Sequence, residues 1–469
     1  MTMKNLHFLI TSGILLKSFR FLLIYTLVGF LTQTLTAQPW MLQQAIGLPN
    51  SLNPTVAFSA VDDNTCWGFN SANSQFLRTT DGGTNWTVST ITGAAGLKGS
   101  GISALDANTA WIIMIDPSNT TSGGIFKTTD GGLNWVKQTT AFQGTGGHPN
   151  VIHFFDADNG VCVGDPRNGY WEIYTSTNGG SDWTRIPAAN IPPPIPSNEL
   201  GISGHEGESF GNSLWFGTFW GSLYRTTDRG MTWTVARNII GDFDGFGFAF
   251  KDSLNGLACT FVTGKKLSHT SDGGATWTRF LPLPTGLSAL STFYINYVKG
   301  TNGSYIITSH NNTGGTEQAI PGSAYSIDNG VTWTYINDLP YGKASFSSSN
   351  VGWSSGINDS VYKWNSDGVL SVKEIDKVAE SYHLEQNFPN PFTEDTKIQF
   401  DIAQNAGSQE VSLIVYDASG KTVANLIDRR LSPGTYEVAF DGTNLPCGIY
   451  YYKLQSGSFT ATRKMILLK

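Results

Sequence analysis

The sequence predicts an all-β protein in which a seven-bladed β-propeller precedes a small C-terminal β-sandwich of the immunoglobulin-like type. Three observations carry this prediction. A ten-residue pattern recurs six times at intervals of 44 to 56 residues, and alternating apolar and polar residues flank the copies. Only 14% of the residues are charged, whereas 53 are glycine. Such a period and composition are typical of repeated four-stranded units joined by tight turns.

The first 37 residues have the pattern of an export signal. Basic residues up to Arg20 precede an apolar run from Phe21 to Leu31, and small residues then lead to Ala37. The run has eleven residues, too few to span a bilayer as a helix. We therefore expect a signal peptide over 1–37 and no transmembrane anchor, with a buried helix of the mature fold as the alternative.

Each copy of the repeated pattern holds Ser or Thr, then Asp or Asn, Gly and Trp at fixed spacing. The Asp or Asn side chain can accept hydrogen bonds from backbone N–H groups and fix a turn, and Gly supplies backbone angles that a Cβ resists. Trp buries a large ring between neighbouring units. The structural positions are Asp81, Asp130, Asn178, Asp228, Asp272 and Asp328, with Trp86, Trp135, Trp183, Trp233, Trp277 and Trp333.

The ends of the repeat array decide the number of units. After Trp333 a degenerate unit runs on to Asp367, and Trp40 lies 46 residues before Trp86, in phase with the series. We expect the segment around Trp40 to supply the last strand of the final unit and to close a ring. That gives seven blades over residues 38–371, and six blades with an irregular cap are the alternative.

The repeated decapeptide is identified as the Asp-box, also called the BNR repeat. Together with an upstream Asp-led turn in most units, it resembles propellers of the photosystem II assembly-factor type. Sortilin-type receptors, sialidases and xyloglucan-cleaving hydrolases also carry the box. The resemblance implies a propeller but no particular activity, because the box is a structural turn in all these families.

The last part of the chain forms a second domain. Residues 372–382 are charged and have the character of a linker, and strand-like segments separated by Asn, Pro and Gly follow over 383–469. An N-F-P-N-P-F opening, a Y-D-A-S-G-K turn, a G-I-Y centre and a K-M-I-L-L-K ending occur in order. These motifs resemble the type A (Por-type) sorting domain of type IX secretion substrates; an ordinary immunoglobulin-like adhesion module is the alternative.

The sorting-domain resemblance implies passage through the outer membrane of a Gram-negative bacterium, with the type IX secretion machinery as a partner of residues 383–469. The product is then secreted or displayed on the outer-membrane surface. Composition agrees with a non-nucleic-acid partner, because the net charge is −7 and no basic run follows the first twenty residues.

Metal and disulfide chemistry are not expected. The seven histidines are scattered without metal-ligand spacing, so we predict no metal and no cofactor. Cys66, Cys162 and Cys259 lie in non-adjacent units and Cys447 in the other domain, so buried thiols are favoured over disulfides. A sialidase is disfavoured, since only Arg167 and Arg237 are placed for a cluster of arginines on the loops.

Function is expected in the long loops that interrupt the repeat, on the face opposite the box turns. The densest group of chemically useful side chains comes from the third and fourth units. Its members expected to bind a ligand are Arg167, Tyr170, Trp171, His205 and Trp220, with the two tryptophans as stacking platforms for a sugar or a partner.

Carboxylates in the same loops are weaker candidates for catalysis. Asp165, Glu206 and Glu208, with Glu199 nearby in the sequence, could supply the acid and base of a glycoside hydrolase. The alternative is that Asp165 forms a turn and the glutamates are solvated. Three functions stay open: a surface propeller that binds a protein or glycan, an extracellular glycoside hydrolase and an assembly or stability factor. A non-catalytic binding role is the leading hypothesis.

Overall fold

The computed structural model describes residues 39–43, 56–118, 123–143, 148–202, 207–237, 246–260, 266–284, 287, 294–310, 321–358, 360–365, 372–376, 379–393, 395–403, 409–431, 433–442 and 445–468. Within these ranges every regular element is a β-strand except a short 3-10 helix at Ala188–Asn190. The predicted all-β class is therefore confirmed. The export signal expected over 1–37 lies outside the described residues.

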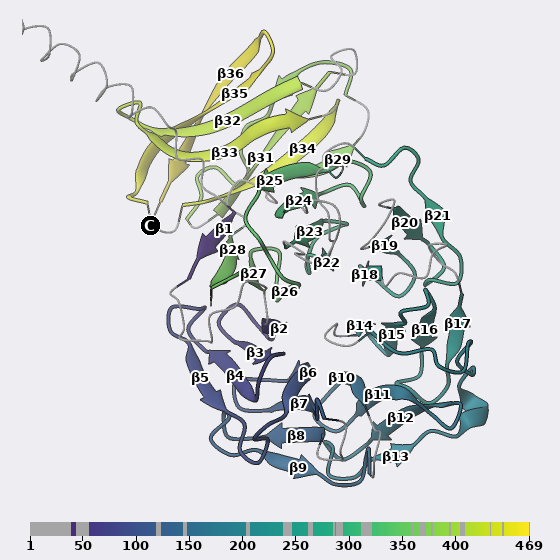
Figure 1. Ribbon diagram of the computed structural model, residues 1–469. Coiled ribbons are helices and arrows are strands. Elements are labelled where there is room, and N and C mark those ends of the chain that lie inside the picture. Colours follow the sequence, from purple (N-terminus) through teal and green to yellow (C-terminus); the bar gives the residue numbers. More distant parts are fainter. Residues whose placement is uncertain are drawn as a thin grey trace, which may run out of the picture. The chain divides into compact units, whose positions relative to one another are not determined.

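Seven four-stranded antiparallel sheets follow one another over the described part of residues 40–365 and stand around a common centre (Figure 1). We refer to them as blades 1 to 7. The strands of blades 1 to 3 are β2 (Val56–Ala60), β3 (Cys66–Asn70), β4 (Gln75–Thr79) and β5 (Thr87–Thr90); β6 (Lys98–Ala104), β7 (Ala110–Ile115), β8 (Gly124–Thr128) and β9 (Val136–Gln138); and β10 (Pro149–Phe154), β11 (Gly160–Arg167), β12 (Tyr170–Ser176) and β13 (Thr184–Arg185).

Blades 4 to 7 repeat this strand order from the centre outward. They consist of β14 (Glu208–Phe210), β15 (Ser213–Gly217), β16 (Leu223–Thr226) and β17 (Thr234–Ala236); β18 (Phe246–Phe250), β19 (Gly256–Thr260), β20 (Leu267–Thr270) and β21 (Thr278–Arg279); β22 (Tyr294–Tyr297), β23 (Tyr305–Ser309), β24 (Gly322–Ser326) and β25 (Thr334–Asn337); and β26 (Ala344–Phe346), β27 (Val351–Ser355), β28 (Val361–Asn365) and β1 (Trp40–Leu42).

The ring closes through β1, which comes from the start of the described chain. It pairs antiparallel with β28, so that Trp40 lies opposite Trp364. The ring of Trp40 is buried, with its centroid 5.2 Å from that of Tyr341 and 5.1 Å from that of Trp364. The segment in phase with the tryptophan series therefore supplies the outer strand of blade 7.

Each box is a turn held by three recurring hydrogen bonds. In blade 1, the Gly83 N–H donates to Thr79 Oγ1 (2.9 Å), Thr79 Oγ1 donates to Asp81 Oδ1 (2.9 Å), and the Asn85 N–H donates to the same carboxylate oxygen (2.9 Å). The same three bonds recur in the other five boxes. This shared geometry explains why Ser or Thr and Asp or Asn occupy fixed positions.

The second glycine of each box lies against the preceding blade. Gly132 has φ +89°, and a Cβ placed there would lie 2.3 Å from Cζ of Phe76 in blade 1. A Cβ at Gly180 would lie 3.0 Å from Nε1 of Trp111 in blade 2. These positions need glycine both for the left-handed backbone and for the close approach.

A tryptophan and a cation join neighbouring blades at the same turns. Trp111 Nε1 and Lys127 Nζ, both in blade 2, donate to the Gly179 carbonyl in the box of blade 3, at 3.1 and 2.8 Å. The Lys127 ammonium also lies 5.1 Å from the centroid of the Trp111 ring, a cation–π contact. Trp215 with Arg225, and Trp353 with Lys363, form similar pairs between other blades.

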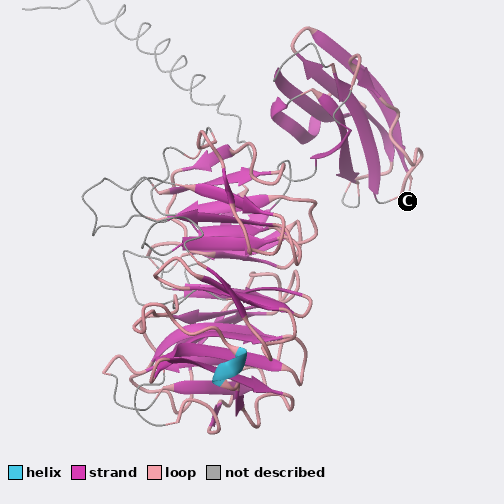
Figure 2. Ribbon diagram, turned by 90° about the vertical axis from the view of Figure 1, so that its right-hand side faces the viewer, coloured by secondary structure: helices cyan, strands magenta, loops and turns pink. Residues whose placement is uncertain are grey.

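Residues 372–468 contain a separate pair of four-stranded sheets. One consists of β29 (Val372–Asp376), β34 (Gly434–Asp441), β31 (Asp395–Ile402) and β30 (His383–Leu384), and the other of β33 (Thr422–Leu431), β32 (Gln409–Asp417), β35 (Gly448–Ser456) and β36 (Phe459–Leu467). Both are seen among the magenta strands of Figure 2. Apolar side chains such as Ile398, Leu413 and Tyr452 are buried in one core cluster.

The sequence predicts a linker over 372–382, and the structure differs in its first half. Val372–Asp376 forms β29 and pairs antiparallel with β34, with Lys373 opposite Glu437. A short charged segment can form an edge strand, because edge strands bury little and need only one hydrogen-bonded neighbour. Val372–Asp376 thus pairs with a strand of the C-terminal domain, and the exact bounds of the linker and of the two domains stay predictions.

All four cysteines lie in the described part of the chain. Cys66, Cys162 and Cys259 are buried, Cys447 is exposed, and none of the four forms a disulfide. Burial raises the pKa of Cys259 to about 12, so this thiol stays protonated at neutral pH. No helix in the described part of the chain is long and apolar enough to cross a membrane.

The packing of the box glycines predicts a large effect at Gly132 and a small one at Gly96. Gly132→Ala adds overpacking against Phe76 to the left-handed strain, and should lower the free energy of unfolding by about 2–5 kcal/mol. Gly96 has a similar φ of +81°, but a Cβ at this position would meet no atom within 4 Å, so Gly96→Ala should cost only about 1–2 kcal/mol. Denaturant unfolding compares them, and equal losses would contradict the role of the contact.

Ring closure predicts a contrast between neighbouring residues of β1. Trp40→Ala should lower the free energy of unfolding by about 3–5 kcal/mol, because Trp40 is buried in blade 7. Met41→Ala, at a side chain 42% exposed on the same strand, should change it by less than about 0.5 kcal/mol. Thermal and denaturant unfolding of both variants measure this, and a Trp40→Ala protein as stable as the parent would show that β1 is dispensable.

Candidate ligand-binding site on the loop face

The strand order of a blade separates two faces of the propeller. Box turns lie beside the turns between the first and second strands, as shown by the Gly82 N–H that donates to the Asn64 carbonyl (2.9 Å). The opposite face carries the loops between second and third strands and the connections from blade to blade. We call it the loop face; Figure 2 shows the propeller with its strands edge-on between the two faces.

Asp165, at the end of β11, fastens the connection between blades 3 and 4. Its Oδ1 accepts hydrogen bonds from Asn150 Nδ2 (2.6 Å) and from the Gly201 N–H (3.0 Å). His148 Nδ1 lies 4.0 Å from Oδ2. Burial raises the pKa of Asp165, although these donors partly offset the shift. The carboxylate therefore acts first as an anchor for the loop that contains Gly201.

Glu199 is a second anchor in the same connection and is fully buried. Its Oε1 accepts from Thr218 Oγ1 (2.6 Å), and its Oε2 accepts from the Ile195 N–H (2.8 Å). Arg237 Nη1 lies 3.5 Å from Oε2 and neutralises the charge. A buried carboxylate is tolerated only with such partners, so the segment 195–199 is fixed to blade 4.

Several large apolar side chains are exposed on the loops that these anchors hold together, among them Ile195, which is 60% exposed. Tyr170 is 51% exposed, Leu200 46% and Phe219 46%. The Phe219 N–H donates to the Leu200 carbonyl (3.1 Å), and Gly201 forms a β-bridge with Thr218. We call Tyr170, Leu200 and Phe219 the loop-face patch.

The other predicted ligand-binding residues lie on the same loops or beside them. Trp220 follows Phe219 and is half-buried, and Arg167, also half-buried, donates from Nη1 to the Gln143 carbonyl (3.2 Å). His205 and Glu206 lie outside the described residues. Tyr170 therefore stays a candidate as a member of the loop-face patch, and Arg167 and Trp220 stay candidates on the same loops.

The prediction that Trp171 stacks on a ligand is wrong. Trp171 is 1% exposed, and its ring packs against Phe216 and Tyr224 of blade 4, with centroids 5.1 and 5.2 Å apart. Its neighbour Tyr170 is exposed instead, because the side chains of successive strand residues point in opposite directions. Trp171 is part of the core between blades 3 and 4.

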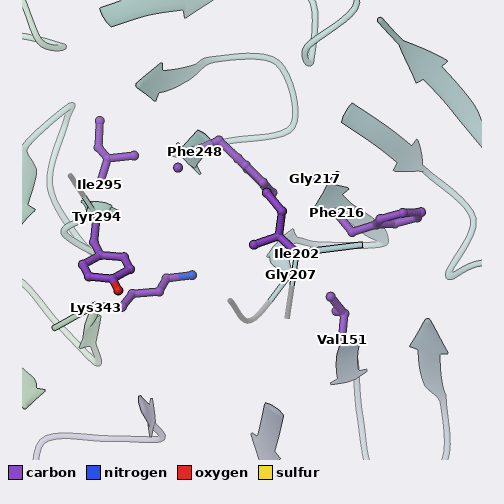
Figure 3. A pocket seen from close by; sticks show the side chains of 10 residues that line it. Val151, Ile202, Gly207, Phe216, Gly217, Phe248, Tyr294, Ile295 and Lys343 are labelled. Carbon is purple, nitrogen blue, oxygen red and sulfur yellow. The ribbon is translucent and has the colours of Figure 1, made fainter. Parts of the chain in front are cut away.

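A small apolar cavity lies at the loop-face end of the propeller centre (Figure 3). Its walls come from blades 3 to 6 and include Val151, Phe216 and Ile295, and the ammonium of Lys343 points among them. The cavity volume is about 20 Å³, which holds one water molecule but no larger ligand. Lys343 Nζ lies 3.2 Å from Glu208 Oε1, so the carboxylate predicted as a catalytic group is paired across the centre.

Leu200, Phe219 and Lys343 are site residues that the sequence analysis missed. Leu200 and Phe219 are large apolar residues in irregular segments outside the repeat, and this is the signal that could have found them. Lys343 carries no such signal, because its position beside Glu208 depends on closure of the ring. Among the described residues, no group of three or more His, Cys, Asp or Glu side chains could hold a metal ion.

Comparisons with known proteins agree with the two-part organisation. Residues 386–468 match the family described as "Secretion system C-terminal sorting domain", and residues 118–247 match "Photosynthesis system II assembly factor YCF48". No protein with a curated description matches the chain. The protein is a BNR-type propeller with a Por-type sorting tail, and this tail indicates export by type IX secretion to the cell surface or beyond.

Solved structures similar to the chain include two of YCF48. "YCF48 bound to D1 peptide" is 18% identical, with a TM-score of 0.52, and the match covers 71% of this chain and 99% of the YCF48 chain. YCF48 from Cyanidioschyzon merolae is 16% identical, also with a TM-score of 0.52, and covers 70% and 98%. At these identities the similarity shows the propeller fold.

The anchor role of Asp165 predicts that its charge is dispensable and its acceptor oxygen is not. Asp165→Asn keeps an oxygen for Asn150 and Gly201, so the free energy of unfolding at pH 7 should be unchanged or higher. Asp165→Ala leaves both donors without this acceptor and should lower it by about 1–3 kcal/mol.

The raised pKa of Asp165 also determines in which direction the free energy of unfolding changes with pH. The folded protein holds the proton more tightly than the unfolded chain, so stability relative to Asp165→Asn should fall as the pH rises above 3.8 towards neutrality. Denaturant unfolding from pH 4 to 7 measures the difference. If Asp165→Asn is as unstable as Asp165→Ala at pH 7, the charge itself is needed.

Proposed function

We propose that this protein is an exported binding propeller whose loop-face patch recognises a segment of another protein. The observation that carries the proposal is that Tyr170, Leu200 and Phe219 are exposed to solvent. Their loops are held in place by hydrogen bonds to Asp165 and Glu199. Single exposed apolar residues are common on protein surfaces. Three on interlinked loops, held by the hydrogen-bonded carboxylates of Asp165 and the fully buried Glu199, form a surface that is already ordered before a partner arrives.

Prior ordering favours binding because little conformational entropy is then lost in the complex. Apolar and aromatic anchors supply most of the affinity at protein interfaces, and surrounding polar groups exclude water. Arg167 and Trp220 lie in the same loops and add a cation and an aromatic ring to the rim. The patch thus offers the side-chain types that a protein segment with apolar residues would need.

A polypeptide is favoured over a glycan for two reasons. Trp171, one of two predicted stacking platforms, is buried, which leaves fewer exposed aromatic rings for sugar rings. In addition, one structure with the same fold is described as YCF48 bound to D1 peptide, which makes a peptide the ligand class to test first. An assembly or stability role is one form that such protein binding could take.

The glycoside hydrolase hypothesis has less support from the geometry. Asp165 is used by two hydrogen-bond donors, and Glu208 is paired with Lys343. Glycosidases need one carboxyl group free to protonate the leaving oxygen and a second free to attack or activate water. The two described carboxylates instead serve to fix loops and to join blades 4 and 7.

The test is peptide selection with the full chain after removal of the signal. Peptides enriched from a displayed random library should bind the parent protein, and Leu200→Ser or Phe219→Ser should weaken binding by about tenfold or more, since each anchor contributes about 1.5–3 kcal/mol. Leu133→Ser is the matched control, because Leu133 is 79% exposed but lies in a box turn. Its affinity should equal that of the parent.

Two outcomes would overturn the proposal. One is peptide binding that Leu133→Ser weakens as much as the patch variants do. The other is failure to select any peptide while a glycan array gives binding that Trp220→Ala abolishes, which would assign the face to sugars. Thermal unfolding of every variant separates loss of binding from loss of fold.

A further inference from the structure

The outer surface of one sheet in the C-terminal domain is unusually apolar. In β32 and β35, alternate residues such as Leu413, Val415 and Tyr452 are buried in the domain core. Residues between them therefore point to the opposite side of the sheet, away from the core. The outer side of a sandwich sheet is ordinarily polar.

Five large apolar side chains gather on this outer side. Tyr451 is paired in register with Tyr416, Ile449 with Ile466, and Ile414 with Lys453. Ile449 is 44% exposed and Tyr451 39%, and the other three are half-buried. We call Ile414, Tyr416, Ile449, Tyr451 and Ile466 the outer apolar face.

Positive charges border the outer apolar face at β35 and β36, and the carboxylate of Asp417 lies at its other side, directly after Tyr416. Lys464 lies next to Tyr451 in the register of β35 and β36, and Lys453 lies one pair further along the sheet. In the described outward side chains of β32, β35 and β36, the acidic residue is Glu410, at the far end of β32. A partner that covers this face would match it best with apolar groups bordered by carboxylates.

A hollow adjoins the same face at Ile449. It is a depression open to solvent with a volume of about 410 Å³, and its walls include Asp417, Ser419 and Cys447 as well as Val423, Leu445, Pro446 and Ile449. A hollow of this size beside a flat apolar surface can receive a protruding side chain of a partner, as anchor residues do at protein interfaces. The outer apolar face therefore has a hollow directly beside it, at Ile449.

We propose that the outer apolar face is the surface by which the sorting domain docks on a protein of the type IX secretion machinery. The occupant presents an apolar surface bordered by carboxylates to Tyr451 and Ile449, with Lys453 and Lys464 pairing to its acidic groups. Residues 386–468 match a secretion sorting domain, which has to be recognised by the export apparatus. This inference concerns export and goes beyond the proposed ligand binding by the propeller.

The test uses the full chain expressed in a bacterium that has a type IX secretion system. The double variant Ile449→Ser/Tyr451→Ser should reach the cell surface and medium at about one tenth of the parent amount or less, with the remainder in the periplasm. Gln455→Ala is the control, because it changes an exposed residue of the same strand outside the outer apolar face. It should be exported like the parent.

Charge reversal gives an independent variant should the double substitution fail to fold. Lys453→Glu/Lys464→Glu should also reduce export, whereas Lys421→Glu, at an exposed turn, should not. Normal export of correctly folded Ile449→Ser/Tyr451→Ser, or of the charge-reversed protein, overturns the proposal.

Two further measurements separate this proposal from others. Deletion of 383–469 should block export; export without these residues would refute the sorting assignment itself, independently of the face. A parent protein that dimerises in solution through the outer apolar face, shown by light scattering and lost in Ile449→Ser/Tyr451→Ser, would assign the face to a second copy and overturn docking on the machinery.

Discussion

The propeller depends on one contact that is repeated around it, the approach of each box turn to the blade before it. The turn can come this close only because its second glycine has no side chain. In the boxes of blades 3 and 5 a tryptophan and a cation of the preceding blade also donate hydrogen bonds to backbone carbonyls of the turn. The second glycine is therefore selected by the neighbouring blade as much as by the turn itself, whereas Asp or Asn is selected by hydrogen bonds within the turn. The six boxes therefore predict the fold but not the ligand.

Because of this contact, the two faces of the propeller differ in how regular their turns and loops are. The box turns are fixed by contacts between blades, so the repeat units differ from one another mainly in the loops of the loop face. Those loops lack the regular hydrogen bonds of strands, and here hydrogen bonds to two carboxylates replace them. Asp165 holds Gly201, and Glu199 holds Thr218 and Ile195. The loops are thereby ordered without being part of a sheet.

Much of the fold could be predicted from the sequence, because the box pattern records local geometry. The hydrogen bonds of Thr79, Asp81 and Gly83 lie within five residues, and even the closing strand was marked by the spacing of Trp40. The site was less predictable. Trp171 was misassigned because its burial depends on Phe216 and Tyr224 of the next blade. Leu200 and Phe219 belong to no repeated pattern in the sequence. Gly201, which donates to Asp165, is 36 residues away from it, and Lys343, which pairs with Glu208, is 135 residues away.

The pairing of β1 with β28 also has a consequence for how the molecule is made. Blades 1 to 6 are built from strands consecutive in the chain, so each can fold as soon as its own residues are available. Blade 7 cannot, because its outer strand precedes blade 1 while its three other strands follow blade 6. The chain therefore stays an open array through most of its synthesis, and it becomes a cooperative closed ring only when its last propeller strands are available.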